Sequence, residues 1–370
     1  MPLGKLPIYN FVHAACPYRL HPFQQSIPGR KQIMPLGKEW LMLFFSLILL
    51  FVLIGAGGYF VSFYGEKLAA AFGMGAGVFG VVFVATVTSL PEVVSTFSAA
   101  LQNLPEIGIG NLLGASEYNF FMLAMAQIMM AREIFHIAAP GHMITSAWVA
   151  VVTGVAGFLG ATAMGGVVWM LGPVGLFTPL LLFLYPLAIY SVSRASPAPA
   201  PEAFPVDKKT KKRWAIKYII AGLLTIAGAA LLPGVAEQFA QVTHISQSIA
   251  GTLIVALATT LPELAVTISA IRLRALDLAF GNCLGSSLFN LSWLFAVDFV
   301  YDHDPLFAHF TPAHLVCLFA IAAQTALVLL TLTLPPRRGF WELRLPALAQ
   351  ILIFVLYLSF LGAMGAKGHG

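Results

Sequence analysis

Charged residues are scarce in this chain. Asp, Glu, Lys and Arg make up only 9% of its 370 residues, whereas a soluble globular domain carries about 25%. Hydrophobic residues make up 59%, and the mean hydropathy is +0.87. A soluble fold could not cover so much apolar surface with so few polar residues. The composition therefore excludes a soluble enzyme, a disordered chain and a nucleic-acid-binding domain, and it predicts an all-α integral membrane protein.

Cysteine and the common catalytic motifs are also rare or missing. The three cysteines, Cys16, Cys283 and Cys317, are widely spaced and form no C-x-x-C pair, so we expect unpaired thiols rather than a disulfide or metal framework. The sequence contains no G-x-x-x-x-G-K-[ST] phosphate-binding loop, no G-x-S-x-G and no H-E-x-x-H. We therefore expect no cofactor and no enzymatic activity.

Apolar stretches long enough to cross a bilayer recur along the chain. A membrane-spanning helix needs about 20 mainly apolar residues, and polar residues such as Arg272, Arg274 and Pro335–Arg338 separate the candidates. We predict ten spans, near residues 40–63, 77–101, 105–130, 143–163, 167–193, 218–240, 246–271, 276–299, 310–334 and 346–365.

A Pro-rich and basic segment divides these spans into two groups of five. Residues 194–217 begin with a Pro-Ala repeat, typical of a stiff linker, and end in a run of Lys and Arg suited to an anionic membrane surface. We therefore predict an N-terminal extension (1–39), a first half (40–193), the linker (194–217) and a second half (218–370).

The distribution of positive charge predicts the orientation. Loops after odd-numbered spans contain Lys and Arg, and loops after even-numbered spans contain none. The positive-inside rule then places the linker 194–217 in the cytoplasm and both chain ends outside. The basic N-terminal segment runs against this rule. It also contains Met-Pro-Leu-Gly-Lys at 1–5 and again at 34–38, which leaves Met1 and Met34 as alternative start positions.

An internal repeat relates the two halves. Residues 85–126 align without gaps with residues 256–297 at an offset of 171, and 15 of the 42 positions are identical. The copies belong to segments 77–130 and 246–299, which are five spans apart, so they enter the membrane from opposite sides. We therefore predict ten transmembrane helices arranged as two inverted five-helix repeats, a layout frequent in secondary transporters with a site near the bilayer midplane.

Each copy carries Leu-Pro-Glu inside an apolar span. The carboxylates of Glu92 and Glu263 are expensive in a membrane, and such residues are functional candidates. Each proline removes a helix hydrogen bond and frees a backbone carbonyl one turn earlier. Hydroxyls precede each glutamate, and Asn119 or Asn290 follows on the next span. Together these groups would form an oxygen cage suited to Ca²⁺, which takes 6–8 oxygen ligands, and Na⁺ could use a similar set.

The two copies, Ala-Thr-Val-Thr-Ser-Leu-Pro-Glu…Gly-Asn-Leu-Leu-Gly-Ala-Ser-Glu-Tyr-Asn and Ala-Leu-Ala-Thr-Thr-Leu-Pro-Glu…Gly-Asn-Cys-Leu-Gly-Ser-Ser-Leu-Phe-Asn, resemble the paired α-repeats of the sodium/calcium exchanger (calcium/cation antiporter) superfamily. The resemblance implies Ca²⁺ antiport against Na⁺ or H⁺ by alternating access, in the plasma membrane (a bacterial inner membrane), with no cofactor. It also implies the ion ligands Glu92, Glu263, Thr88, Ser89, Thr259, Thr260, Asn119, Asn290, Ser286, and the carbonyls of Ala85 and Ala256.

Three positions depart from the superfamily pattern. Ala115 lacks the usual serine hydroxyl, Asn290 stands where many sodium-coupled members carry Asp, and Ser116-Glu117 replaces a common Asn-apolar pair. The implied cage therefore carries two negative charges, which one Ca²⁺, two Na⁺ or two H⁺ would neutralise, so the coupling ion stays open. By its position on the helix, Glu117 should face away from the cage.

Two other classes remain as alternatives. A passive cation channel could use the same oxygen ring, and an intramembrane enzyme would need a catalytic set that the sequence does not display. Asp298, Asp302 and Asp304 could attract cations at the outer mouth, but we expect them to form a solvated acidic loop.

Overall fold

The computed structural model describes residues 36–71, 87–132, 139–168, 170–171, 174–175, 178–195, 206–301, 305–333 and 340–367. The first half contains α2 (Leu36–Ala71), α4 (Leu90–Leu101), α5 (Pro105–Met129), α6 (Ala139–Met164) and α7 (Thr178–Ala195). The second half contains α8 (Lys208–Thr243), α9 (Gln247–Ala250), the π-helical turn η3 (Gly251–Val255), α10 (Ala256–Thr259), α11 (Leu261–Arg272), α12 (Leu276–Ser292), α13 (Leu294–Val300), the 3-10 turn η4 (Leu306–His309), α14 (Pro312–Thr333) and α15 (Phe340–Lys367).

The described part of the chain is predominantly helical and suited to a membrane. Six of its helices are long and apolar enough to cross one, and a bent pair, Gln247–Thr259 with Leu261–Arg272, would make a seventh. Large apolar side chains lie exposed on the outer helices, among them Leu41, Phe183 and Phe319. Such a surface is stable only against lipid, which confirms a multi-pass membrane protein. The count of ten spans remains a prediction.

The helix boundaries repeat along the chain. The helices α4 and α11 each contain 12 residues, and both their first and last residues lie 171 positions apart. The starts of α5 and α12 show the same offset. The helices α2 and α8 contain 36 residues each. Since Pro91 and Pro262 stand in the first turn of α4 and α11, where a missing N–H costs nothing, the repeated Leu-Pro-Glu accounts for the matching helix starts.

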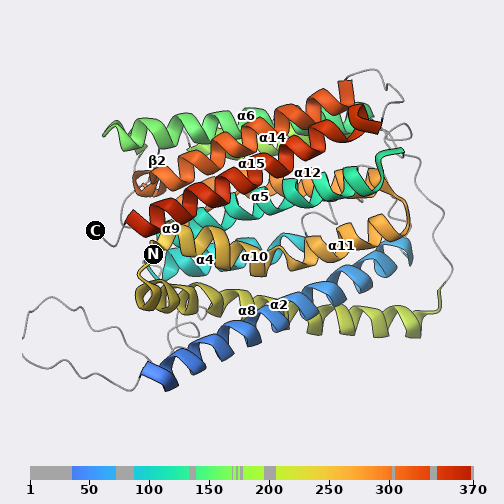
Figure 1. The fold of residues 1–370 in the computed structure, drawn as a ribbon. Helices are drawn as coiled ribbons and strands as arrows, with labels where there is room; N and C mark the ends of the chain where they lie inside the picture. Colours follow the sequence, from blue (N-terminus) through green and yellow to red (C-terminus); the bar gives the residue numbers. More distant parts are fainter. Residues whose placement is uncertain are drawn as a thin grey trace, which may run out of the picture.

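The helices pack in layers (Figure 1). The long helices α2 and α8 lie together along one side of the molecule, and α6, α14 and α15 lie together along the opposite side. Between them run α5 and α12, which contact each other, and α4 and α11 lie next to these two. The largest buried cluster joins α5, α12, α6 and α14 through side chains such as Phe120, Leu123, Phe280 and Leu284. The motif helices therefore lie in the centre of the bundle.

The predicted span 167–193 differs from the structure at its start. Two-residue strands, β1 (Met170–Leu171) and β2 (Val174–Gly175), pair antiparallel there, and the helix begins only at Thr178. Asp298 joins β2, α7 and η4, because its carboxylate accepts hydrogen bonds from Gly175 N (2.9 Å), Thr178 Oγ1 (2.7 Å) and Leu306 N (2.6 Å). Asp298 is 1% exposed, so the expectation of a solvated acidic side chain at this position was wrong. Asp302 and Asp304 lie outside the described residues.

The start of α8 lies at the end of the basic linker. The carboxylate of Asp207 accepts a hydrogen bond from Thr210 N at 3.1 Å and caps the helix. Hydrogen bonds from the Thr210 side chain and backbone lower the pKa of Asp207. A charged cap of this kind favours the positive end of the helix dipole. It fixes the helix start just before the lysines of the basic run.

Candidate functional site

The two glutamates of the motif occupy equivalent places. Glu92 is the third residue of α4 and Glu263 the third residue of α11, and both are completely buried. Their carboxylates lie close enough for their charges to interact. Each stands in the first turn of its helix, where the helix dipole stabilises a negative charge by about 0.3–1 kcal/mol. The structure therefore brings the two predicted acidic ligands together in the interior of the bundle.

The hydroxyls before each Leu-Pro-Glu reach across to the other repeat. Ser89 Oγ donates a hydrogen bond of 2.8 Å to Glu263 Oε1, and Thr88 also lies against Glu263. In the other direction, Thr259 Oγ1 donates at 3.0 Å to Asn111 Oδ1 on α5. The backbone at Ser89 and Thr260 leaves the helical conformation at the same relative position. This interruption lets residues of one repeat contact residues of the other.

A matched pair of asparagines anchors each motif helix to the next helix. Asn111 Nδ2 donates to the backbone oxygen of Glu92 and to Thr96 Oγ1, both at 2.9 Å. Its repeat equivalent, Asn282, donates to the backbone oxygen of Glu263 at 3.3 Å and to Thr267 Oγ1 at 3.4 Å. Sequence reasoning did not include these asparagines among the candidate site residues. Their identity in both copies of Gly-Asn-x-Leu-Gly was the signal that could have identified them.

Close backbone packing positions α5 against the helices that precede Glu263. A Cβ atom added at Gly114 would overlap the carbonyl oxygen of Thr252 and would lie 2.8 Å from the Cβ atom of Ala256. Only a glycine allows this approach. Thr252 belongs to the π-helical turn η3, and such turns are frequent at functional sites. The approach brings α5 to the segment that carries Thr259.

Several buried oxygens of the site have no hydrogen-bonding partner among the described residues. They are both carboxylate oxygens of Glu92, Oε2 of Glu263, and the side-chain amide oxygens of Asn119 and Asn290. Burying a polar atom without a partner costs free energy, so these atoms are available to bind a cation. No cluster of three or more His, Cys, Asp or Glu residues occurs in the described chain. A cation here would therefore meet two carboxylates and otherwise neutral oxygens.

The other predicted ligands are placed as follows. Ser286 Oγ donates to Glu263 Oε1 at 3.3 Å, so α12 contributes to the same carboxylate. Thr260 Oγ1 donates at 2.6 Å to the carbonyl oxygen of Ala256, and the Thr260 side chain also lies against Glu92 of the other repeat. Asn119 and Asn290 are fully buried on α5 and α12. The predicted ligand Ala85 lies outside the described residues.

Glu117 contacts a helix outside the repeated motifs. Gln324 Nε2 on α14 donates a hydrogen bond of 2.7 Å to Glu117 Oε2, and both residues are completely buried. The Glu117 side chain thus points toward α14, which agrees with the expectation that it faces away from the cage.

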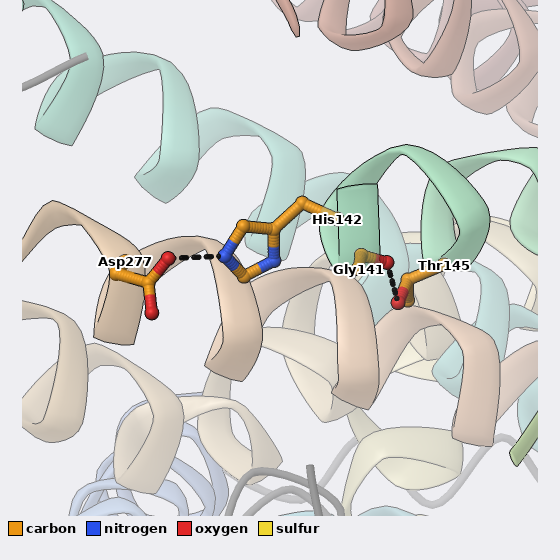
Figure 2. A network of polar contacts seen from close by, with 4 residues as sticks. All are labelled: Gly141, His142, Thr145 and Asp277. Carbon is orange, nitrogen blue, oxygen red and sulfur yellow. Dashed lines mark hydrogen bonds and ion pairs between the residues drawn. The ribbon is translucent and has the colours of Figure 1, made fainter. Parts of the chain in front are cut away.

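A hydrogen bond between side chains ties α12 to α6 near the start of both helices. His142 Nε2 lies 2.8 Å from Asp277 Oδ1, as Figure 2 shows. The His142 ring also packs at a tilt against Phe280, with centroids 5.4 Å apart. Figure 2 further shows Thr145 donating to the carbonyl oxygen of Gly141 within α6. This contact fixes the start of α12, whose later turns carry Ser286 and Asn290.

A bundle of apolar helices with a pair of buried, electrostatically interacting carboxylates is typical of a membrane ion transporter. The family model described as sodium/calcium exchanger protein matches residues 42–194 and 214–364. The chain belongs to this family. It is therefore an ion exchanger and not an enzyme.

Individual proteins agree with this assignment. Inner membrane protein YrbG of Escherichia coli K12 is 24% identical over 237 residues, covering 60% of this chain and 69% of YrbG. The structure of the sodium-calcium exchanger NCX_Mj has a TM-score of 0.55 at 20% identity, covering 86% of this chain and 98% of NCX_Mj. The structure of the H⁺/Ca²⁺ exchanger CAX has a TM-score of 0.64 at 16% identity, covering 89% of this chain and 88% of CAX. At these identities the two structures show a shared fold.

Proposed function

We propose that this protein exchanges Ca²⁺ for Na⁺ or H⁺ across the plasma membrane, by alternating access to one site between the two repeats. The observation that carries the proposal is the pair of buried glutamates, Glu92 and Glu263, linked across the repeats by the Ser89–Glu263 hydrogen bond. Family membership supports ion exchange, and the named substrates of NCX_Mj and CAX support Ca²⁺ as one of the ions.

The chemistry of the site favours a hard divalent cation. Ca²⁺ prefers carboxylate, amide, hydroxyl and carbonyl oxygens at about 2.3–2.6 Å, and these are the groups that the motif helices contribute. We propose the ligands Glu92, Glu263, Thr88, Ser89, Thr259, Thr260, Asn119, Asn290 and Ser286, with the carbonyls of Ala85 and Ala256. Two carboxylates balance the charge of one Ca²⁺. The same two charges are balanced by two Na⁺ or two H⁺, so the exchanged ions compete for one site.

Alternating access follows from the proposed topology. In our proposal, ten spans form two inverted five-helix repeats, with the linker 194–217 in the cytoplasm. The long helices α2 and α8 would then slide or rock against the central helices and open the site to one side at a time. Close contact between Gly58 of α2 and Pro262 of α11 supports this coupling, because Pro262 directly precedes Glu263.

The test is radiolabelled Ca²⁺ uptake by the purified full chain in proteoliposomes, with a Na⁺ gradient, an H⁺ gradient or none. Exchange requires uptake that depends on one of the imposed gradients. Uptake that is equal with and without both gradients would indicate a passive cation channel. Absence of Ca²⁺ flux under all three conditions would refute calcium antiport.

A further inference from the structure

A groove runs along the outer face of the bundle where α2 packs against α8. Its volume is about 380 Å³, and its lining includes Val52, Ala56 and Phe60 from α2 and Ile220, Leu224 and Lys217 from α8. The side chains of Val52, Phe60, Ile220 and Leu224 are 46–60% exposed. Because the chain crosses a membrane, a groove with this lining opens toward lipid acyl chains.

One end of the groove is charged. Lys217 is exposed, and its Nζ atom lies 5.4 Å from the centre of the Tyr64 ring, which also lines the groove. One turn further toward the helix ends, Lys67 Nζ lies 4.1 Å from the Phe63 ring and 5.3 Å from the Trp214 ring. Aromatic residues and lysines of this kind gather where a helix leaves the hydrocarbon layer. The groove therefore runs from a basic, aromatic interface into the apolar interior of the membrane.

The length of the groove matches one leaflet. Val52 and Tyr64 stand 12 residues apart on α2, which is about 18 Å of helix at 1.5 Å per residue. Half of a hydrocarbon core of about 30 Å is about 15 Å. A phospholipid could thus lay an acyl chain along the groove while its phosphate meets Lys217. A basic pocket between membrane helices is a recognised form of anionic headgroup site.

We propose that the α2–α8 groove binds an anionic phospholipid, with the phosphate at Lys217 and an acyl chain between Val52 and Tyr64. The lipid would act close to the exchange site, because the neighbouring face of α2 packs on α11. A Cβ atom at Gly55 would lie 2.9 Å from Leu261 Cδ1, and one at Gly58 would overlap Pro262. An occupied groove would therefore fix the spacing of α2 and α8 beside Glu263.

The experiment measures lipid retention by native mass spectrometry of the purified full chain, after exchange into phosphatidylglycerol or phosphatidylcholine. The wild type should retain phosphatidylglycerol in preference to phosphatidylcholine. Lys217→Gln should lower phosphatidylglycerol retention about fivefold, the value of one lysine contact with an anionic lipid. Lys212→Gln is the matched control, since it removes the same charge from an exposed lysine of the same helix that does not line the groove.

A second variant tests the apolar part of the groove. Ala56→Phe should reduce retention of both lipids, because its ring would occupy the space of the acyl chain. Equal losses in Lys217→Gln and Lys212→Gln would mean diffuse attraction to surface charge and would overturn the proposal. Wild-type retention in Lys217→Gln would overturn it as well. Because retention is measured without transport, the result is independent of the proposed ion exchange.

Discussion

Replacement of Glu92 by glutamine separates ion binding from folding. Glu92 is completely buried, and neither of its carboxylate oxygens has a hydrogen-bonding partner among the described residues. Glutamine has the same shape without the charge and keeps an oxygen that can face Thr260, so Glu92→Gln removes no hydrogen bond of regular geometry that the described structure shows. We expect the variant to unfold, in the absence of Ca²⁺, at the wild-type temperature or above it. Higher stability with lost function is the signature of a side chain kept for binding.

The loss of Ca²⁺ affinity should be large. A carboxylate oxygen at about 2.5 Å from Ca²⁺ contributes on the order of 10 kcal/mol of attraction at an effective dielectric constant of about 20. Even if desolvation offsets three quarters of this, about 3 kcal/mol remains, which is more than a hundredfold in affinity. At a Ca²⁺ concentration of about 100 times Kd, the wild type should gain about 2.7 kcal/mol of stability. The variant should gain almost none at the same concentration.

The assay is thermal unfolding of the detergent-solubilised full chain across a Ca²⁺ series, with Ca²⁺ flux measured in parallel. The matched control is Glu117→Gln, because Glu117 is equally buried but bonds to Gln324 of α14. This control should keep the Ca²⁺-dependent rise in unfolding temperature. A wild-type rise in Glu92→Gln, or loss of the rise in both variants, would refute the assignment of Glu92 as an ion ligand.

Two further predictions concern the contacts that assemble the site. Ser89→Ala removes the 2.8 Å hydrogen bond to Glu263 and should lower the free energy of unfolding by about 1.5–3 kcal/mol if that carboxylate is charged. The control Ser287→Ala loses only a bond within its own helix and should lower it less. Equal losses of unfolding free energy, measured by denaturation, would contradict the cross-repeat role of Ser89. Gly114→Ala should lower the free energy of unfolding by about 1–3 kcal/mol through overpacking. The control Gly154→Ala, whose new Cβ atom would have no neighbouring atom within 4 Å, should leave the unfolding temperature unchanged or raise it. If Gly114→Ala does not lower the stability, α5 can move away from η3.

The sequence predicted the central elements well because their signals are local. Pro91 and Pro262 fix the starts of α4 and α11, and the shared Leu-Pro-Glu brought both glutamates into the predicted site. The family assignment confirmed the resemblance on which the ligand set rests. The position where a helix starts and the offset between the two repeats depend on short segments, and an alignment of the chain with itself detects both.

Contacts between distant segments could not be predicted in the same way. The sequence showed only that the Ser89 hydroxyl precedes Glu92, whereas the interruption at Ser89 directs that hydroxyl to Glu263, 174 residues away in sequence. Asp298 looked like a loop residue because an acidic cluster follows it, yet it joins the end of β2 to the start of α7 as a buried acceptor of three hydrogen bonds. Such contacts depend on how whole helices pack, which no local pattern specifies.

The two repeats are similar in sequence, but their glutamates accept different hydrogen bonds. Glu263 accepts hydrogen bonds from Ser89 and Ser286. The Thr260 hydroxyl lies beside Glu92 without a hydrogen bond of regular geometry, and the position equivalent to Ser286 is Ala115, which has no hydroxyl. A hydroxyl that donates its proton to a carboxylate keeps its lone pairs for a cation, so Ser89 and Ser286 can orient Glu263 and still face an ion bound at its free Oε2 atom. The residues that are identical in the two repeats thus determine which side chains meet. The few positions that differ determine which hydrogen bonds each carboxylate accepts.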